Sequence, residues 1–182
     1  MKELRIHGRG GQGAAVASRI LSTAFVHEGK YAAGFPLFGV ERRGAPVTAF
    51  VRFDENRIRE NTGIYHPDCL IVIDPRLFHV KKIFDGIKVG GVVVVNAPEK
   101  ITASCHENLG CIGAVDATGI AVQEIGAAIT NTCMLGAFAR TTGWIELDSV
   151  LSALTEYFSG EKLKRNMRTV QRGFDETQVV SV

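Results

Sequence analysis

Apolar residues recur along the chain with two periods, and the alternation between them predicts an α/β protein. Apolar or alternating runs of strand length cover residues 4–7, 31–35, 47–53, 69–73 and 92–95, with a weaker run at 111–115. Apolar positions at helical spacing cover residues 14–21, 120–125, 130–139, 147–158 and 163–174. Under the right-handed crossover rule, this order predicts a doubly wound, mainly parallel sheet with a Rossmann-like first strand and helix.

Two of the predicted strands, residues 69–73 and 92–95, are apolar at every position and end in a polar residue. Continuous runs of this kind are typical of central parallel strands that are buried on both faces. Between them, Pro75 stands where a helix can begin, Asp74 is suited to cap it, and apolar residues recur at helical spacing over 77–84. We therefore expect one βαβ unit here.

The composition is that of an ordinary globular domain. With 182 residues, the chain has the length of one domain, which we take to span residues 1–182. A formal net charge of +2 and the lack of a basic tract argue against nucleic acid as a partner. The longest aliphatic run, residues 92–95, is too short to cross a bilayer, and the N-terminus does not resemble a signal peptide. We expect a cytoplasmic protein without a membrane partner.

A glycine-rich segment directly follows the first predicted strand. Gly8, Gly10 and Gly13 have the GxGxxG spacing, and Gly11 and Gln12 lie between them. In this motif the glycines allow a tight turn, close approach of a ligand and close packing of the next helix. The helix that follows directs its unpaired N–H groups and the positive end of its dipole towards the loop. These five residues are candidates for binding an anionic cofactor.

One part of the dinucleotide-binding pattern is missing. A nicotinamide site has an acidic residue about 20 positions further on, where it holds the ribose hydroxyls. The second predicted strand, residues 31–35, contains no acidic residue, and Glu28 comes too early. The loop is therefore predicted to bind an anionic group other than a nicotinamide dinucleotide.

The turn-rich segment 36–46 supplies a second candidate for anion binding. Arg42 and Arg43 follow Glu41 directly, and guanidinium groups bind phosphates through planar, bidentate donors. A salt-bridged surface loop or a subunit contact accounts for the same residues.

No other cluster forms a convincing catalytic or metal site. The cysteines are irregularly spaced without a CxxC pair, which favours free structural thiols over an iron–sulfur cluster or a zinc ribbon. A metal cluster drawn from residues 105–107 with Cys111 matches no standard spacing. Asp74 and Asp116 each follow an apolar strand, where either a functional acid or a helix N-cap is expected. Hydrolase and P-loop motifs are absent from the sequence.

Four motifs together resemble the gamma subunit of the 2-oxoacid:ferredoxin oxidoreductases. They read HGRGGQG at 7–13, FPLFGVERRGAPV at 35–47, DCLIVID at 68–74 and NTCMLGA at 131–137. The resemblance covers essentially the whole chain. It implies a subunit of a complex that oxidatively decarboxylates a 2-oxoacid to an acyl-CoA and reduces ferredoxin, or runs in reverse.

The resemblance also implies cofactors and partners. Thiamine diphosphate and the iron–sulfur clusters belong to other subunits of the complex, which contains alpha, beta and delta chains, and the isolated chain is expected to be inactive. The gamma chain is expected to help form the coenzyme A pocket, so residues 10–13 with Arg42 and Arg43 become candidates for contacts with its phosphates. Coenzyme A needs no acid on its ribose, which fits the missing acidic residue.

Segment 39–46 is more similar to the pyruvate and branched-chain enzymes than to the 2-oxoglutarate enzymes. We therefore expect pyruvate as the substrate of the complex, with a branched-chain 2-oxoacid next. Two alternatives stay open from the residues alone: a free-standing NAD(P)-dependent oxidoreductase, and a non-catalytic scaffold or binding module.

Overall fold

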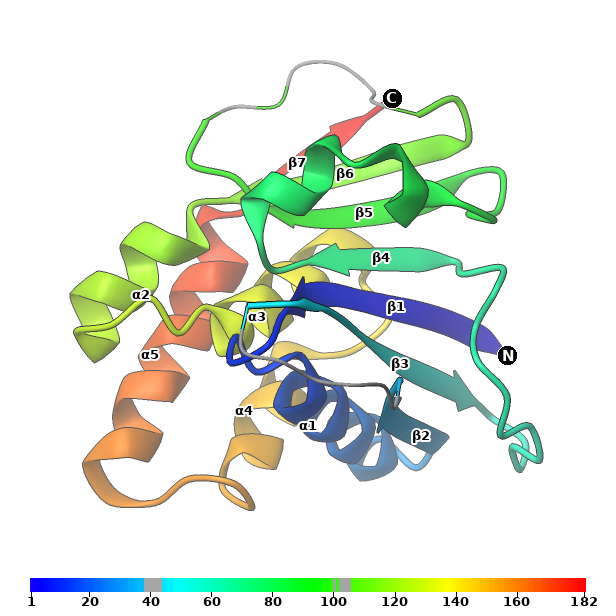
Figure 1. Ribbon diagram of the computed structural model, residues 1–182. Helices are drawn as coiled ribbons and strands as arrows, with labels where there is room; N and C mark the ends of the chain where they lie inside the picture. The colour runs from blue at the N-terminus through cyan, green and yellow to red at the C-terminus, as the bar shows by residue number, and fades with distance from the viewer. Residues whose placement is uncertain (38–43, 100, 102–105) are drawn as a thin grey trace.

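A seven-stranded mixed sheet forms the centre of the molecule (Figure 1). The computed structural model describes residues 1–37, 44–99, 101 and 106–182. The strands are β1 (Lys2–Arg9), β2 (Tyr31–Pro36), β3 (Pro46–Asp54), β4 (Cys69–Val72), β5 (Gly91–Asn96), β6 (Leu109–Val115) and β7 (Gln178–Ser181). The α-helices are α1 (Ala14–His27), α2 (Ala117–Ile125), α3 (Asn131–Thr142), α4 (Leu147–Leu154) and α5 (Gly160–Glu176).

The strand order is β2-β3-β1-β4-β5-β6-β7, and its centre is parallel. β1, β4, β5 and β6 pair in parallel, whereas β3 and β7 run antiparallel to their neighbours. β2 is antiparallel to β3 and therefore runs in the same direction as β1. The predicted α/β class and the mainly parallel sheet are confirmed. The short strand β7 was not predicted, because its few apolar residues carry no clear pattern.

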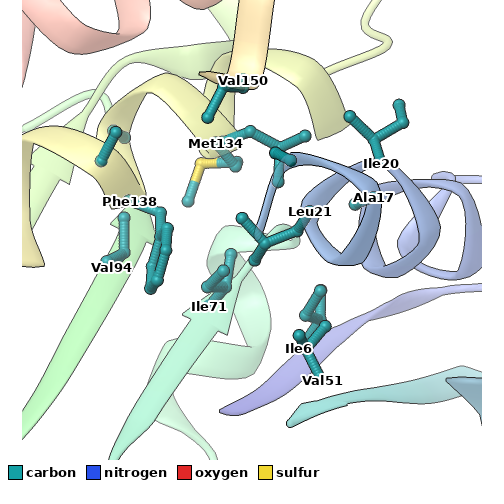
Figure 2. Close-up of a cluster of buried hydrophobic side chains, with 14 of the residues drawn as sticks. Ile6, Ala17, Ile20, Leu21, Val51, Ile71, Val94, Met134, Phe138 and Val150 are labelled. Carbon is teal, nitrogen blue, oxygen red and sulfur yellow. The ribbon is translucent and has the colours of Figure 1, made fainter. Parts of the chain in front are cut away.

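One face of the sheet packs against α1, α3, α4 and α5, and this layer holds the larger core (Figure 2). Ile6, Ile71 and Val94 point from three neighbouring strands towards Leu21 of α1 and Met134 of α3. All five side chains are fully buried. Each buried aliphatic side chain of this size contributes about 1.5–3 kcal/mol to folding, so this layer dominates the stability of the domain.

Helices α3 and α5 approach so closely that their backbones touch. A Cβ atom at Gly136 would overlap the carbonyl oxygen of Val170, and one at Gly173 would overlap the carbonyl oxygen of Cys133. Glycine at position 136 of α3 and at position 173 of α5 therefore permits this close helix contact. Any side chain at Gly136 forces the two helices apart.

The opposite face of the sheet is covered by two 3-10 helices, η1 (Pro75–His79) and η2 (Lys81–Phe84), which lie over β5 in Figure 1. The single helix predicted over 77–84 is therefore wrong, although its start at Pro75 is right. Val80 is extended (φ −93°, ψ 103°) and exposed, which interrupts the helix. The interruption allows Leu77, Ile83 and Phe84 to be buried together, although they do not share one helical face.

Replacing Gly136 with alanine is expected to lower the free energy of unfolding by about 3 kcal/mol, because overpacking at a backbone contact forces a backbone shift. Urea unfolding of the purified chain measures this change. Lys164→Ala, at an exposed position of α5, is the control and should shift stability by less than about 0.5 kcal/mol. Equal stability of the Gly136 variant and the wild type would contradict the backbone contact.

His7 gives the domain a pH-dependent stability. Its side chain lies on the face of β1 opposite to Leu4 and Ile6, and its Nε2 atom is buried without a hydrogen-bond partner in the described part of the chain. Burial is the main cause that lowers the pKa of His7 to about 3, and the neighbouring Arg5 charge is the second cause. The folded protein thus keeps His7 neutral at pH values where an unfolded chain would protonate it.

Stability contributed by the neutral His7 is complete above about pH 6.5 and is lost as the pH falls towards 3. The expected slope approaches about 1.4 kcal/mol per pH unit in this window. His7→Leu should remove that component of the slope, whereas His66→Gln, at an exposed histidine, should retain it. Denaturant unfolding at pH 7, 6, 5 and 4 tests this, and parallel curves for His7→Leu and the wild type would contradict it.

Candidate ligand site at the carboxyl edge of the sheet

The glycine loop, residues 8–13, connects β1 to α1 at the carboxyl edge of the parallel strands. Gly13 is the N-cap residue of α1 and has a left-handed conformation (φ 80°, ψ 25°). A Cβ atom there would also lie 2.5 Å from Nδ2 of Asn131, so both the backbone and the packing require glycine. Gly11 also has a positive φ of 94°, but it faces open space. The predicted strand, glycine turn and helix are therefore confirmed.

Gln12 holds the loop in shape from within. Its side-chain oxygen accepts a hydrogen bond from the backbone N–H of Arg9 (2.7 Å), and its amide nitrogen donates to Oδ2 of Asp74 (3.1 Å). Both ends of the side chain are therefore engaged by the protein. The sequence suggests Gln12 as a cofactor ligand, whereas these contacts give its side chain a structural role.

Asp74 joins the loops that follow β1 and β4. Its side chain is 1% exposed and accepts hydrogen bonds from Arg9 Nε (3.0 Å), Gln12 Nε2 (3.1 Å) and three nitrogens of Arg76 (2.9–3.1 Å). The hydrogen bonds from Arg76 are the main cause that lowers the pKa of Asp74 to about 2. One of them comes from the backbone N–H of Arg76, so the N-cap role of Asp74 is confirmed.

The antiparallel strand β3 explains the missing acidic residue. In a dinucleotide-binding fold, the strand next to β1 is parallel to it and ends beside the ribose. Here β3 occupies that position and begins at this edge, where Pro46 pairs with Arg9. The strand β2, on which the acidic residue was sought, lies one position further out. Within residues 1–37 and 44–99, no strand therefore ends where the ribose-binding acid belongs.

The segment before β3 contacts the glycine loop directly. The N–H of Gly10 donates to the carbonyl oxygen of Ala45 (2.8 Å), and the N–H of Gly44 donates to that of Gly10 (3.2 Å). Arg9 Nη1 also donates to the carbonyl oxygen of Gly44 (3.1 Å). Arg42 and Arg43, the other predicted cofactor-binding residues, lie outside the described residues.

A cleft of about 590 Å³ opens beside the glycine loop on its α5 side. Gly11 and Gly13 form one wall, and the start of α5 forms the other. Four apolar side chains line the cleft, Val16, Ile125, Ile129 and Phe158, and the polar or charged residues are Asn131 of α3 and Glu161, Lys162, Arg165 and Asn166 of α5. Its size suits an extended organic ligand, and the start of α1 adds a positive dipole end.

Two asparagines hold the walls of this cleft together. Asn131, at the start of α3, donates from Nδ2 to the carbonyl oxygen of Gly13 (3.4 Å), and its side chain is buried with Oδ1 unpaired in the described part of the chain. Asn166 of α5 accepts from Thr132 (2.9 Å) and donates to the carbonyl oxygen of Lys162 (2.9 Å). α3 thus fixes α5 relative to the glycine loop.

Sequence reasoning missed the α5 side of this cleft. Lys162 and Arg165 lie about 150 residues after the glycine loop in the sequence, and nothing in their local pattern distinguishes them from an ordinary exposed helix face. Of the residues that line the cleft outside the glycine loop, Asn131 lies within one of the four motifs, at 131–137. The pairing of α3 with α5 brings these residues to the loop.

The remaining candidate residues have structural roles or form no metal site. Asp116 accepts a hydrogen bond from the N–H of Gly119 (2.9 Å) and caps α2, which is the structural alternative of the two predicted for it. Cys69, Cys111 and Cys133 are free thiols, and burial raises the pKa of Cys133 to about 12. Among the described residues, which do not include Cys105, no group of three His, Cys, Asp or Glu residues could hold a metal ion. None of the described helices has both the length and the apolar character needed to cross a bilayer.

The fold and the loop define a Rossmann-like α/β domain in which a glycine-rich turn joins the first strand to the first helix. Residues 3–176 match the pyruvate ferredoxin/flavodoxin oxidoreductase family, and the chain belongs to that family. It is 47% identical over 182 residues to the pyruvate/ketoisovalerate oxidoreductases common subunit gamma of Thermococcus kodakarensis, with 98% of each chain covered. The chain is thus a subunit of a 2-oxoacid:ferredoxin oxidoreductase, which sets aside the free-standing oxidoreductase considered above.

Solved structures show the same architecture. The pyruvate oxidoreductase subunit PORC from Thermotoga maritima superposes with a TM-score of 0.86 at 36% identity, covering 99% of this chain and 98% of that one. A 2-oxoglutarate:ferredoxin oxidoreductase from Magnetococcus marinus, solved with 2-oxoglutarate, coenzyme A and succinyl-CoA bound, contains the fold with a TM-score of 0.76. At 19% identity, over 94% of this chain and 30% of that chain, this second likeness concerns the fold alone.

Replacing Asp74 with asparagine is expected to destabilise the domain by about 2 kcal/mol at pH 7, because it removes the charge that Arg9 and Arg76 share. A carboxylate with a lowered pKa contributes stability above its ordinary value of 3.8, and this contribution is lost as the pH falls towards 2. The gap between variant and wild type should therefore narrow below pH 4. Denaturant unfolding over pH 3–7 measures it, with the exposed Asp175→Asn as control, and a gap that stays constant would contradict the role of the charge.

Proposed function

We propose that this chain is the gamma subunit of a complex that oxidatively decarboxylates a 2-oxoacid to an acyl-CoA and reduces ferredoxin. In this proposal alpha, beta and delta subunits complete the complex, which works in the cytoplasm. They hold thiamine diphosphate and the iron–sulfur clusters, and the gamma chain contributes to the coenzyme A pocket and to assembly. Pyruvate is the first candidate for the substrate, followed by a branched-chain 2-oxoacid.

The single observation that carries the coenzyme A assignment is the cleft beside the glycine loop. Coenzyme A is an elongated molecule with a diphosphate, a further phosphate on its ribose, an adenine ring and a pantetheine arm that contains both apolar and polar groups. The start of α1 at Gly13 is suited to the diphosphate because its N–H groups and dipole attract anions. The apolar residues Val16, Ile125 and Phe158 are suited to the rest of the molecule.

Two further observations support coenzyme A over a nicotinamide dinucleotide. Strand β3 runs antiparallel to β1, so within the described residues no strand ends on that side of β1, where the ribose-binding acid would lie. Coenzyme A carries a phosphate at the ribose 3′ position and does not require that acid.

The choice of 2-oxoacid has weaker support, because the Thermococcus relative is named as common to pyruvate and ketoisovalerate enzymes. A subunit of that description is not expected to select the oxoacid.

Gly11→Val tests the role of the loop. A valine side chain at φ 94° strains the turn and projects into the open space beside Gly11 that a ligand would occupy. In the assembled complex, the KM for coenzyme A is expected to rise roughly 10-fold or more, which corresponds to losing about 1.4 kcal/mol of binding. The KM for the 2-oxoacid should stay within about 2-fold of the wild type, because the thiamine site is assigned to other subunits.

Gly29→Val is the matched control for this experiment. Gly29 also has a positive φ, of 78°, with no atoms near its Cβ position, but it lies at the opposite end of α1. It therefore introduces the same type of strain away from the cleft. If Gly11→Val leaves the KM for coenzyme A unchanged, or if both variants raise it equally, the loop does not bind coenzyme A.

A further inference from the structure

The cleft carries positive charge on the wall opposite the glycine loop. Lys162 and Arg165 lie one turn apart on α5, and both are exposed. Lys162 Nζ lies 5.2 Å above the ring of Phe158, and in the described part of the chain Lys162 has no ion pair. Arg165 Nε lies 3.6 Å from Glu161 Oε1, in a pair whose side chains are 47% and 61% exposed. Such an exposed pair is weak, and a phosphate can displace it.

The other cations near the glycine loop are already engaged. Arg9 and Arg76 direct their guanidinium groups at the buried carboxylate of Asp74, and Arg9 also donates to the carbonyl oxygen of Gly44. Breaking these contacts would leave a buried charge without its partners, which is costly. Among the described residues that line the cleft, Lys162 and Arg165 are therefore the cations available to a ligand.

We infer that Lys162 and Arg165 recognise a phosphate monoester of the ligand, separate from the diphosphate at the glycine loop. This inference rests on the proposed function, and for coenzyme A the group is the 3′-phosphate of its ribose. The two residues are then specificity determinants that distinguish coenzyme A from 3′-dephospho-coenzyme A. They do not take part in the chemistry of the oxoacid.

The packing of α5 makes this recognition selective. Asn166 donates to the carbonyl oxygen of Lys162 and accepts from Thr132, so the first turns of α5 are held at a fixed place relative to α3. Asn131 in turn holds α3 to Gly13 of the glycine loop. Because both walls are connected through α3, the separation between the two phosphate positions is set by the fold. A ligand that lacks the second phosphate loses the contacts on α5 only.

The ring of Phe158 gives the cleft a place for a flat group. Phe158 lines the cleft beneath Lys162, and Ile125 and Ile129 add apolar surface to the same cleft. An adenine ring that packs there would place its ribose phosphate near the start of α5. The apolar and the cationic parts of this wall therefore fit one adenosine phosphate group.

The test compares coenzyme A with 3′-dephospho-coenzyme A as co-substrates of the assembled complex. In the Lys162→Ala and Arg165→Ala double variant, the KM for coenzyme A is expected to rise roughly 10- to 100-fold, the range expected for losing hydrogen bonds to a charged group. The KM for 3′-dephospho-coenzyme A should change by less than about 2-fold. Lys164→Ala, an exposed lysine of the same helix that does not line the cleft, is the matched control and should alter neither KM.

Glu161→Gln is expected to change the KM for coenzyme A in the opposite direction. It removes the carboxylate that pairs with Arg165, so it should lower the KM for coenzyme A and leave that for 3′-dephospho-coenzyme A unaltered. If the double variant raises both KM values equally, or raises neither, the assignment of Lys162 and Arg165 is overturned. A different result would contradict the proposed function: an unchanged KM for coenzyme A in the Gly11→Val variant.

Discussion

The buried carboxylate of Asp74 is the interaction on which the edge of the sheet depends. It is almost fully buried, and it binds groups from the loops after β1 and β4 at once, through Arg9, Gln12 and Arg76. A carboxylate in this position keeps its charge because those donors stabilise it, which is why its pKa falls to about 2. The shape of the glycine loop follows from these bonds, since Gln12 is held at both ends. Gly13, the N-cap residue of α1, lines the cleft beside this loop.

The strand arrangement decides what kind of ligand this loop can take. An antiparallel β3 beside β1 removes the strand end that carries the ribose acid in nicotinamide enzymes, yet it leaves the glycine turn and the start of α1 in place. The described part of the site therefore keeps the glycine turn of a dinucleotide fold and lacks the strand end that carries the ribose-binding acid in such a fold. α3 and α5 supply the second wall, through a helix contact that Gly136 and Gly173 make possible.

Prediction from the sequence was accurate where local periodicity and long-range packing agree. The central strands, the glycine turn and the N-cap roles open to Asp74 and Asp116 follow from short patterns of residues, and the structure has them. It failed over 77–84, where three buried side chains required an interruption at Val80 that no helical periodicity contains. The hydrogen bond from the Gln12 side chain to Asp74, 62 residues further along the chain, was also not predicted. A contact between such distant residues leaves no local trace in the sequence.

The sequence by itself determined the class of fold, the position of the glycine loop, the absence of an acid from residues 31–35 and the resemblance to the oxidoreductase family. These follow from hydrophobic period, glycine spacing and motifs that are read locally. Only the tertiary structure decided that β3 fills the position next to β1, that Asn131 contacts the glycine loop, and that Lys162 and Arg165 line the same cleft as that loop. The physical reason is that the strand order and the α3–α5 contact depend on how residues far apart in the sequence pack against one another. Local sequence patterns do not contain that information.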